Sequence, residues 1–418
     1  MPQVVPFDTV SLYNDAMDRM NGEERRSIDT IDGAAMLTQV ERWVAVNSGT
    51  RNVAGLNTMA GMLADSFAML PGDITLIDPD PVETVDADGT VRAIEHGRHL
   101  LVSVRPEAPV RMLFTGHMDT VYGVDHAFQA MRYTDPNTLN GPGAADMKGG
   151  IAVMLAALAA VEAGGIGDRF GYDVMINSDE ETGSFSSARL IDRVARGKVA
   201  AFTYEPALPD GTLAGARGGT GNFSIVITGR SAHAGRNPED GRNAIVAAAD
   251  IALRLNAVRG PRLAVNPARI DGGGPNNVVP DHAVLRVNFR PHGLDEIERA
   301  RSQIDAAVAE VAAAHDVTIA VHGSFNRPPK PIDAGAAKLF ALVQQAGADL
   351  SIPIAWRDTG GVCDGNNIAA CGVPVIDTMG VRGGAIHSSD EYMIVDSLAE
   401  RARLSAVAIA RIAGVGGL

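Results

Sequence analysis

From about residue 100 to residue 205, the sequence alternates short apolar runs with segments of helical character. An Ala-rich apolar helix from Gly150 and a helix over Ser186–Arg196 separate the runs. Strands that alternate with helices favour a mostly parallel sheet covered on both faces. The chain is therefore predicted to be an α/β protein. Its strand-like runs are Leu100–Arg105, Met112–Gly116, Tyr172–Ser178 and Val199–Glu205.

Acidic and imidazole side chains follow these runs or lie in the glycine-rich turn GPGAADMKGG at 141–150. Because the carboxyl ends of strands in an α/β sheet converge on one crevice, we expect residues that are distant in sequence to meet there. One histidine near the C-terminus completes the set. The members are His117, Asp119, Asp146, Glu180, Glu181, Glu205 and His387.

These residue types suit a hydrolytic site with two metal ions. Such a site needs one carboxylate between ions roughly 3.5 Å apart, His and carboxylate ligands on each ion, and a water that ionises near neutral pH. Asp146 is our candidate for the shared ligand. Zn²⁺ accepts this mixed set of nitrogen and oxygen ligands. A carboxylate beside the metal must also move the proton of the water, and the adjacent pair Glu180 and Glu181 can supply both functions.

A second pattern, β-α-β-β-α-β, begins near residue 217 and is typical of a ferredoxin-like unit. Sheet-like and helical segments follow it at Val373–Met379 and Leu398–Ile412, so the unit is predicted to be inserted into the first domain. The predicted domains are a catalytic domain at 1–216 and 328–418 and an inserted domain at 217–327. Residues 1–30 are expected to form a loose arm before a helix over Ile31–Val46. The segments of the insertion are Asn222–Gly229, Gly241–Val258, Arg262–Asp271, His282–Arg290, Leu294–His315 and Val317–His322.

Composition excludes several classes of partner. The formal net charge of −14 disfavours nucleic acid and anionic membrane surfaces, because both reward clustered Lys and Arg. Cys363 and Cys371 cannot make a disulfide framework, and the first residues lack the pattern of a secretory signal. The longest apolar run, Ile151–Val161, is shorter than the roughly 20 residues of a membrane helix. We expect a cytoplasmic protein.

Six motifs together resemble the M20 metallopeptidase family, and their order and spacing are most similar to its glutamate carboxypeptidase branch. The resemblance extends from about residue 38 to the end of the chain. The segment Thr359–Asn367 departs from that branch and looks more like other branches of the family. The motifs are HMDT at 117–120, GPGAADMKGG at 141–150, NSDEETGS at 177–184, YEP at 204–206, TGRSAHAG at 228–235 and AIHSSDEY at 385–392.

The resemblance implies a zinc-peptidase-like catalytic domain with two Zn²⁺ per subunit, and with Co²⁺ or Mn²⁺ as alternatives. It also implies that the insertion is a lid and a homodimer interface. Asp146 would bridge the ions, His117 and Glu205 would complete one, and Glu181 and His387 the other. Glu180 would be the general base and then the acid, while Asp119 would orient His117.

In the insertion, His233 is similar to a family histidine that crosses the dimer interface to stabilise the oxyanion. Asn277 and Arg290 resemble clamps for the terminal carboxylate of the substrate, and Arg327 resembles a further arginine of glutamate-specific members. A guanidinium suits a carboxylate because it donates two parallel hydrogen bonds. On residues alone, Arg290 also fits a solvated arginine on the polar face of a strand.

The predicted function is hydrolysis of an amide bond next to a free carboxylate, with release of a C-terminal glutamate or a related amino acid. The first alternative is an N-acyl-amino-acid deacylase, similar to acetylornithine deacetylase or aminoacylase. The alternative of another class is an inactive binding protein with the same fold. The presence of all five expected metal ligands together with Glu180 favours an active enzyme.

Overall fold

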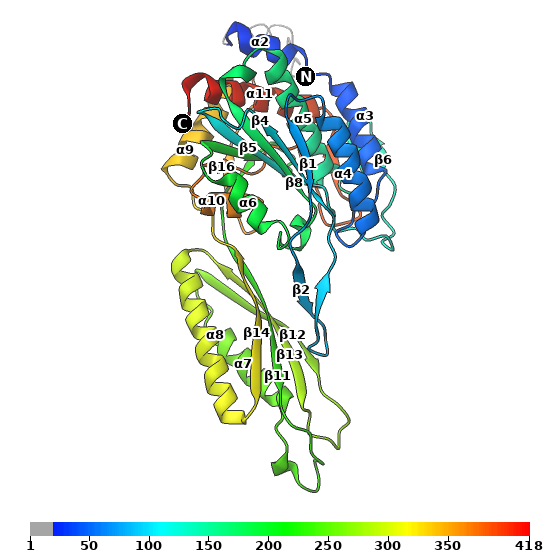
Figure 1. The fold of residues 1–418 in the computed structure, drawn as a ribbon, viewed down its shortest axis with the longest axis vertical. Coiled ribbons are helices and arrows are strands. Elements are labelled where there is room, and N and C mark those ends of the chain that lie inside the picture. The colour runs from blue at the N-terminus through cyan, green and yellow to red at the C-terminus, as the bar shows by residue number, and fades with distance from the viewer. Residues whose placement is uncertain (1–19) are drawn as a thin grey trace, which may run out of the picture.

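A six-stranded sheet forms the centre of the larger unit in the computed structural model, which describes residues 20–418 (Figure 1). Its strand order is β1-β4-β8-β5-β9-β16. The pairs β8–β5, β5–β9 and β9–β16 are parallel, whereas β1–β4 and β4–β8 are antiparallel. The predicted α/β sheet is confirmed, and its parallel strands lie on the side that carries β5, β8 and β9. The strands are β1 (Asp73–Ile77), β4 (His99–Val104), β5 (Arg111–His117), β8 (Gly171–Asn177), β9 (Ala200–Thr203) and β16 (Val375–Ile376).

Both faces of this sheet are covered, as the alternation of side chains along each strand requires. Met112 and Phe114 of β5 belong to the large core, together with residues of α3, α4, α5, α9 and α11. Leu113, between them, packs in a smaller core with residues of α6 and α10 on the opposite face. The helices are α3 (Gly33–Val44), α4 (Val53–Phe67), α5 (Gly150–Ala163), α6 (Ala188–Ala195), α9 (Ala334–Asp349), α10 (Asp364–Ala370) and α11 (Ser397–Val415).

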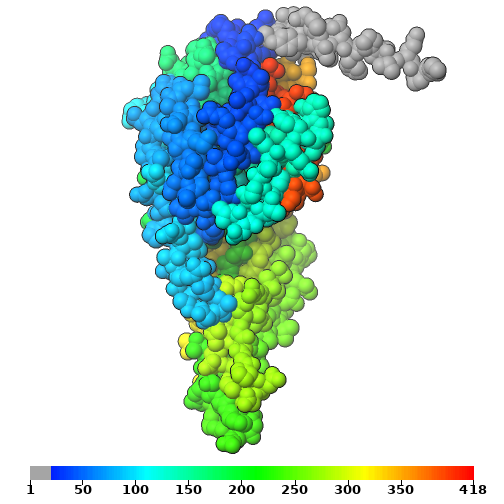
Figure 2. Space-filling model, turned by 90° about the vertical axis from the view of Figure 1, so that its right-hand side faces the viewer, coloured from blue at the N-terminus to red at the C-terminus, as the bar shows by residue number. Residues whose placement is uncertain are grey.

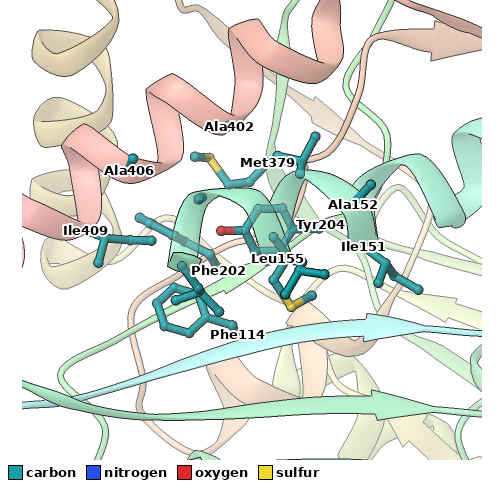
Figure 3. Packing of buried hydrophobic residues seen from close by; sticks show 14 of the residues in the cluster. Phe114, Ile151, Ala152, Leu155, Phe202, Tyr204, Met379, Ala402, Ala406 and Ile409 are labelled. Atoms are coloured by element: carbon teal, nitrogen blue, oxygen red, sulfur yellow. The ribbon is translucent and has the colours of Figure 1, made fainter. Parts of the chain in front are cut away.

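Helix α5 is the helix predicted after the glycine turn, and it lies inside the large core (Figure 3). Its start packs closely on the end of β9, since a Cβ added at Gly150 would lie 1.9 Å from the backbone oxygen of Tyr204. The turn η1 (Ala144–Gly149) precedes it directly. Within residues 20–418, Ala144–Ala163 is the one helical segment long and apolar enough to cross a membrane, and 89% of its apolar window is buried inside the protein. That burial is typical of a core helix.

Smaller sheets surround this core. The sheet β17-β18-β7-β6 pairs Tyr392 with Asn140, which brings the C-terminal motif beside the glycine turn. Strands β10 and β15 form a parallel pair, and β2 and β3 form a hairpin. These strands are β2 (Val82–Val85), β3 (Val91–Ile94), β6 (Arg132–Asp135), β7 (Thr138–Asn140), β10 (Leu213–Arg217), β15 (Trp356–Thr359), β17 (Gly383–Gly384) and β18 (Tyr392–Ile394).

The predicted β-α-β-β-α-β order is present in a second unit, drawn below the first in Figure 1. Its antiparallel sheet has the order β12-β13-β11-β14, and its two helices pack on one face around a separate hydrophobic core. The β2–β3 hairpin reaches down to this unit (Figure 2). There Arg286 donates a hydrogen bond of 2.8 Å to the backbone oxygen of Val85. The elements are β11 (Thr220–Thr228), α7 (Ala244–Ala257), β12 (Leu263–Gly272), β13 (His282–Pro291), α8 (Leu294–His315) and β14 (Thr318–Arg327).

The prediction of a loose arm over residues 1–30 is wrong for its last part. Residues 1–19 lie outside the described residues, but α2 (Gly22–Asp29) is a helix with a capping box at Asn21. Glu24 of this helix accepts a hydrogen bond of 2.9 Å from Arg411 of α11. The polar composition of α2 concealed a helix whose position is fixed by tertiary contacts. Helices α4, α9 and α10 were also not predicted.

Candidate metal centre and active site

His117 ends β5 with its side chain buried. Its Nδ1 lies 3.0 Å from the backbone oxygen of Asp119. A carbonyl oxygen only accepts, so Nδ1 carries the proton and the lone pair of Nε2 is free to bind a metal ion. The carboxylate of Asp119 lies farther from the ring, at 3.4 Å from Nδ1. The predicted orientation of His117 by Asp119 is therefore supported mainly by a backbone contact.

The carboxylate of Asp119 also accepts hydrogen bonds from other segments. It accepts hydrogen bonds of 3.2 Å from the backbone N–H groups of both Glu180 and Glu181. The hydroxyl of Thr50 donates to it at 2.7 Å. Asp119 therefore fixes the start of the turn after β8, which carries the two adjacent acids, relative to the end of β5.

Asp146 lies in η1, where its own backbone angles are not helical. A buried acid that the sequence analysis did not select, Glu391, holds this turn. Glu391 Oε1 accepts the N–H groups of Ala145 and Asp146 at 3.0 Å each, and Oε2 accepts that of Gly143 at 3.2 Å. The hydroxyl of Tyr122 donates to Oε2 at 2.8 Å. Glu391 lies within the AIHSSDEY motif, but nothing local in that motif indicates that its side chain is buried.

The predicted ligands meet around Asp146. His117 Nε2 lies 3.0 Å from Asp146 Oδ1, and His387 Nε2 lies 3.3 Å from Asp146 Oδ2. Glu205 Oε2 is 3.7 Å from His117 Nε2, and Glu181 Oε2 is 3.1 Å from His387 Nε2. Each oxygen of Asp146 thus faces one histidine, and each histidine faces one further carboxylate.

This donor set fits a pair of divalent cations. The donor atoms of His117, Asp146 and Glu181 lie within 4.8 Å of one another, and so do those of His117, Glu180 and Glu205. Glu205 Oε1 is buried without a hydrogen-bond partner. Gathering four carboxylates in a largely buried space is costly unless cations compensate their charge.

The pKa values of the metal-free site reflect the crowding. Burial raises the pKa of Glu180 to about 7, although the nearby guanidinium of Arg327 opposes the shift. Burial, with the charge of Asp146, raises the pKa of Glu181 to about 8. Hydrogen bonds to Asp146 and Glu181 raise the pKa of His387 to about 11. In the metal-free site the imidazolium of His387 supplies part of the positive charge that cations would otherwise supply.

A cavity of about 300 Å³ opens beside the ligands. Its other wall is formed by β10, β15 and the loop after β15, and it combines apolar side chains with the guanidinium groups of Arg217 and Arg357. An amide substrate of a few residues fits such a space. The lining residues are Asp146, Glu180, Glu181, Glu205, Pro206, Leu208, Thr212, Leu213, Ala214, Arg217, Arg357, Thr359, Gly361, Val362, Cys363, Thr378, Ile386 and His387.

The structure does not bring His233, Asn277 or Arg290 to this cavity. All three are exposed, and none lines it. His233 and Asn277 lie in neighbouring loops, joined by a hydrogen bond of 3.0 Å from Ala234 N to Asn277 O. The segment between β11 and α7, which carries His233, lies at the end of the second unit remote from the six-stranded sheet (Figure 1). Arg290 Nε donates to Asn288 Oδ1 at 2.9 Å.

Arg327 is placed differently from its prediction as a substrate ligand. Its side chain is 5% exposed and does not line the cavity. Its Nη2 lies 2.7 Å from Glu180 Oε1 and 3.5 Å from Asp364 Oδ1. Asp364, which was not predicted to be functional, starts α10 and is also buried.

Comparisons with known proteins agree with this geometry. The model of peptidase family M20/M25/M40 matches residues 113–411, well over half of the chain. Carboxypeptidase G2 of Pseudomonas sp. (strain RS-16) is 27% identical over 385 residues, which cover 90% of this chain and 89% of that protein. Succinyl-diaminopimelate desuccinylase of Pseudoalteromonas translucida is 28% identical over 306 residues, covering 68% of this chain and 79% of that protein.

A solved structure supports the fold. The aminopeptidase PepT of Bacillus cereus superposes with a TM-score of 0.70 and 22% identity, covering 92% of this chain and all of that one. At this identity the likeness concerns the fold alone. It extends over both units of the present structure.

Proposed function

The chain belongs to the peptidase family M20/M25/M40, and on that premise we propose that this hydrolase is a dinuclear zinc carboxypeptidase. It would cleave an amide bond next to a free carboxylate and release a C-terminal glutamate or a related amino acid. The observation that carries the proposal is the placement of Asp146, whose two oxygens face His117 at 3.0 Å and His387 at 3.3 Å. A carboxylate in that position can bridge two ions.

His117, Glu205 and Asp146 would hold one ion, and Glu181, His387 and Asp146 the other. When bound, the ions supply Lewis acidity and a water that ionises near neutral pH. Glu180 lies in this cluster without being needed as a ligand, so it can take a proton from the water and later donate it to the leaving amine nitrogen. Burial raises the pKa of Glu180 above its ordinary value, which makes the carboxylate a stronger base.

A second candidate is hydrolysis of an N-acyl amino acid whose acyl group is small. The desuccinylase relative favours this candidate. So does the segment 359–367, because it departs from the pattern of the glutamate carboxypeptidase branch and part of it lines the cavity. Both reactions use the same residues and differ in which side of the amide bond is large. The substrate panel described below separates them.

We further propose that residues 217–327 form the lid and the homodimer interface, with residues 1–216 and 328–418 as the catalytic domain. The position of the segment that carries His233 supports this, since it lies remote from the metal ligands of its own chain (Figure 1). A second chain could present its His233 to this site, where it would stabilise the oxyanion. Asn277 and Arg290 would bind the substrate carboxylate on lid closure. A cytoplasmic location stays a prediction from the sequence.

The test is a panel of N-acyl and peptidyl amino acids that varies one group at a time. We expect hydrolysis when the carboxylate is free and a loss of at least about 10²-fold in kcat/KM when it is amidated, because a clamp that lid closure encloses would lose its partner. Matched substrates carry Glu, Asp, Ala or Lys at the C-terminus, each with a short or a long acyl group. Their kcat/KM values show whether the enzyme selects the C-terminal residue or the acyl group. Equal turnover of free and amidated substrates would refute the proposal.

A further inference from the structure

The chain connects the two units twice. The second connection, which returns from the insertion to the first unit, begins at Arg327. Arg327 is the last residue of β14 and pairs with Thr220 at the start of β11. Although its backbone belongs to the sheet of the second unit, its side chain is buried against the loop that follows β8 in the first. It therefore joins the insertion directly to the segment that carries Glu180 and Glu181.

Several contacts define this junction. Arg327 Nη2 lies 2.7 Å from Glu180 Oε1 and donates to the backbone oxygen of Glu180 at 2.8 Å. It also donates to Ser184 Oγ at 2.9 Å. The neighbouring Asn326 donates to the backbone oxygen of Gly183 at 2.9 Å. Two consecutive side chains of β14 thus hold both ends of the short turn that presents Glu180.

A second carboxylate lies near the same guanidinium nitrogen. Asp364 Oδ1 is 3.5 Å from Arg327 Nη2, and Asp364 Oδ2 accepts a hydrogen bond of 2.6 Å from Asn177 at the end of β8. Nη2 of Arg327 therefore faces two buried acids, Glu180 and Asp364. Removing one partner of a buried charged group leaves the others uncompensated, so the position of Glu180 depends on Arg327.

This geometry argues against a substrate carboxylate as the partner of Arg327. The guanidinium does not line the cavity, and its charge already faces two carboxylates of its own chain. We propose that Arg327 is a positioning residue that fixes the Glu180 carboxylate and couples its position to the orientation of the insertion. The inference rests on the proposed role of Glu180 as general base. A change in the orientation of the insertion turns the end of β14, and with it the Arg327 side chain that contacts the base.

A double-mutant cycle tests the coupling. We expect Arg327→Gln to lower kcat by at least about 10-fold with KM changed less than about 2-fold, because it acts on the base rather than on binding. In single-turnover measurements on the Glu180→Gln background, the same change should lower the rate less than about 2-fold, since residues that act as a unit are not additive. Arg327→Lys, which keeps the charge, should recover part of kcat. Arg299→Gln, an exposed change on α8, is the matched control.

Each outcome decides between roles. A rise in KM with kcat retained would identify Arg327 as a substrate clamp, and multiplied losses in the double variant would show that it acts independently of Glu180. If Glu180→Gln alone leaves kcat unchanged, Glu180 is not the general base, and the proposed function is refuted on that point.

Hydrogen exchange of the amides at 179–187 is read out separately and without substrate. It should be faster in Arg327→Gln and unchanged in Arg299→Gln, and unchanged exchange in Arg327→Gln would refute the positioning role. If Arg327→Gln does not fold, the same measurements on Arg327→Lys and Asn326→Ala replace it. Failure of both to loosen this segment would overturn the proposal.

Discussion

Replacing Glu391 by Gln should change how the stability of the metal-free protein depends on pH. Burial, together with the charge of Asp146, raises the pKa of Glu391 to about 7 from an ordinary value of 4.5. A carboxyl group whose pKa is raised on folding stabilises the folded state below its unfolded pKa, and that contribution is lost as the pH rises through the folded value. The relevant window therefore lies between about pH 4.5 and pH 8.

The size of the effect follows from the two pKa values. Linkage with 4.5 in the unfolded chain and about 7 in the folded protein predicts that Glu391 costs the wild type about 2.5 kcal/mol between pH 5 and pH 8. Gln has nearly the same shape and does not titrate. The difference in unfolding free energy between Glu391→Gln and wild type should thus shift by about 2.5 kcal/mol in favour of the variant over this range.

The hydrogen bonds of Glu391 determine how far the unfolding free energies of variant and wild type differ at pH 5. An amide oxygen can still accept two N–H groups of the turn, but its NH₂ group would face the third, so Glu391→Gln should lose about 1 kcal/mol at pH 5. Glu391→Ala leaves three buried donors without partners and should lose at least about 3 kcal/mol at pH 5. Because Ala does not titrate either, this loss should shrink by the same pH-dependent amount as the pH rises to 8.

Urea unfolding of chelator-treated protein at pH 5, 6, 7 and 8 measures these values. Glu298→Gln, an exposed change on α8, serves as the control and should show no pH-dependent difference. A constant difference between Glu391→Gln and wild type from pH 5 to pH 8 would refute the reasoning. It would mean that the three N–H donors outweigh burial and keep the carboxylate ionised throughout.

Three further predictions concern the proposed chemistry. Glu180→Gln should keep its metal content by elemental analysis while kcat falls by at least about 10²-fold, and loss of metal instead would exchange its role with that of Glu181. Chelation should abolish turnover, and reloading at pH 7 should release about two protons in calorimetry across different buffers, because His387 and Glu181, with pKa values of about 11 and about 8, must lose theirs. Release of no protons would contradict this arrangement. Mixing His233→Ala with Glu180→Gln under subunit exchange should restore about a quarter of wild-type activity, since half of the dimers carry one intact site; no recovery despite proven exchange would place His233 outside the partner's site.

The alternating pattern of residues 100–205 was sufficient to predict the parallel strands of the sheet, because buried strands are apolar throughout and their ends are marked by polar residues. The insertion was predicted segment by segment for the same reason. Helix α2 was missed because its residues are mostly polar, and its stability comes from the cap at Asn21 and from Arg411 of α11. No local window contains that contact.

The convergence of the seven site residues could be predicted because each follows a strand end or lies in a recognisable motif. What could not be predicted is which buried groups hold them in place. Glu391 and Asp364 act through backbone and side-chain contacts to segments far away in sequence. The distance between the His233 loop and the metal ligands of the same chain depends on the orientation of the insertion, which no pattern in one strand or helix encodes.

The two ends of the inserted segment enter the second sheet as hydrogen-bonded neighbours, Thr220 and Arg327. Once the insertion has folded, its two ends are held one strand spacing apart. For the rest of the chain it then has the loop-closure entropy of a short loop. Closing a loop of a few residues instead of the whole segment lowers the entropic cost by roughly 3 kcal/mol. The first unit can therefore continue from β10 to α9 across this interruption almost as easily as across an ordinary loop. The length of the insertion is free to vary without weakening the sheet that bears the metal ligands.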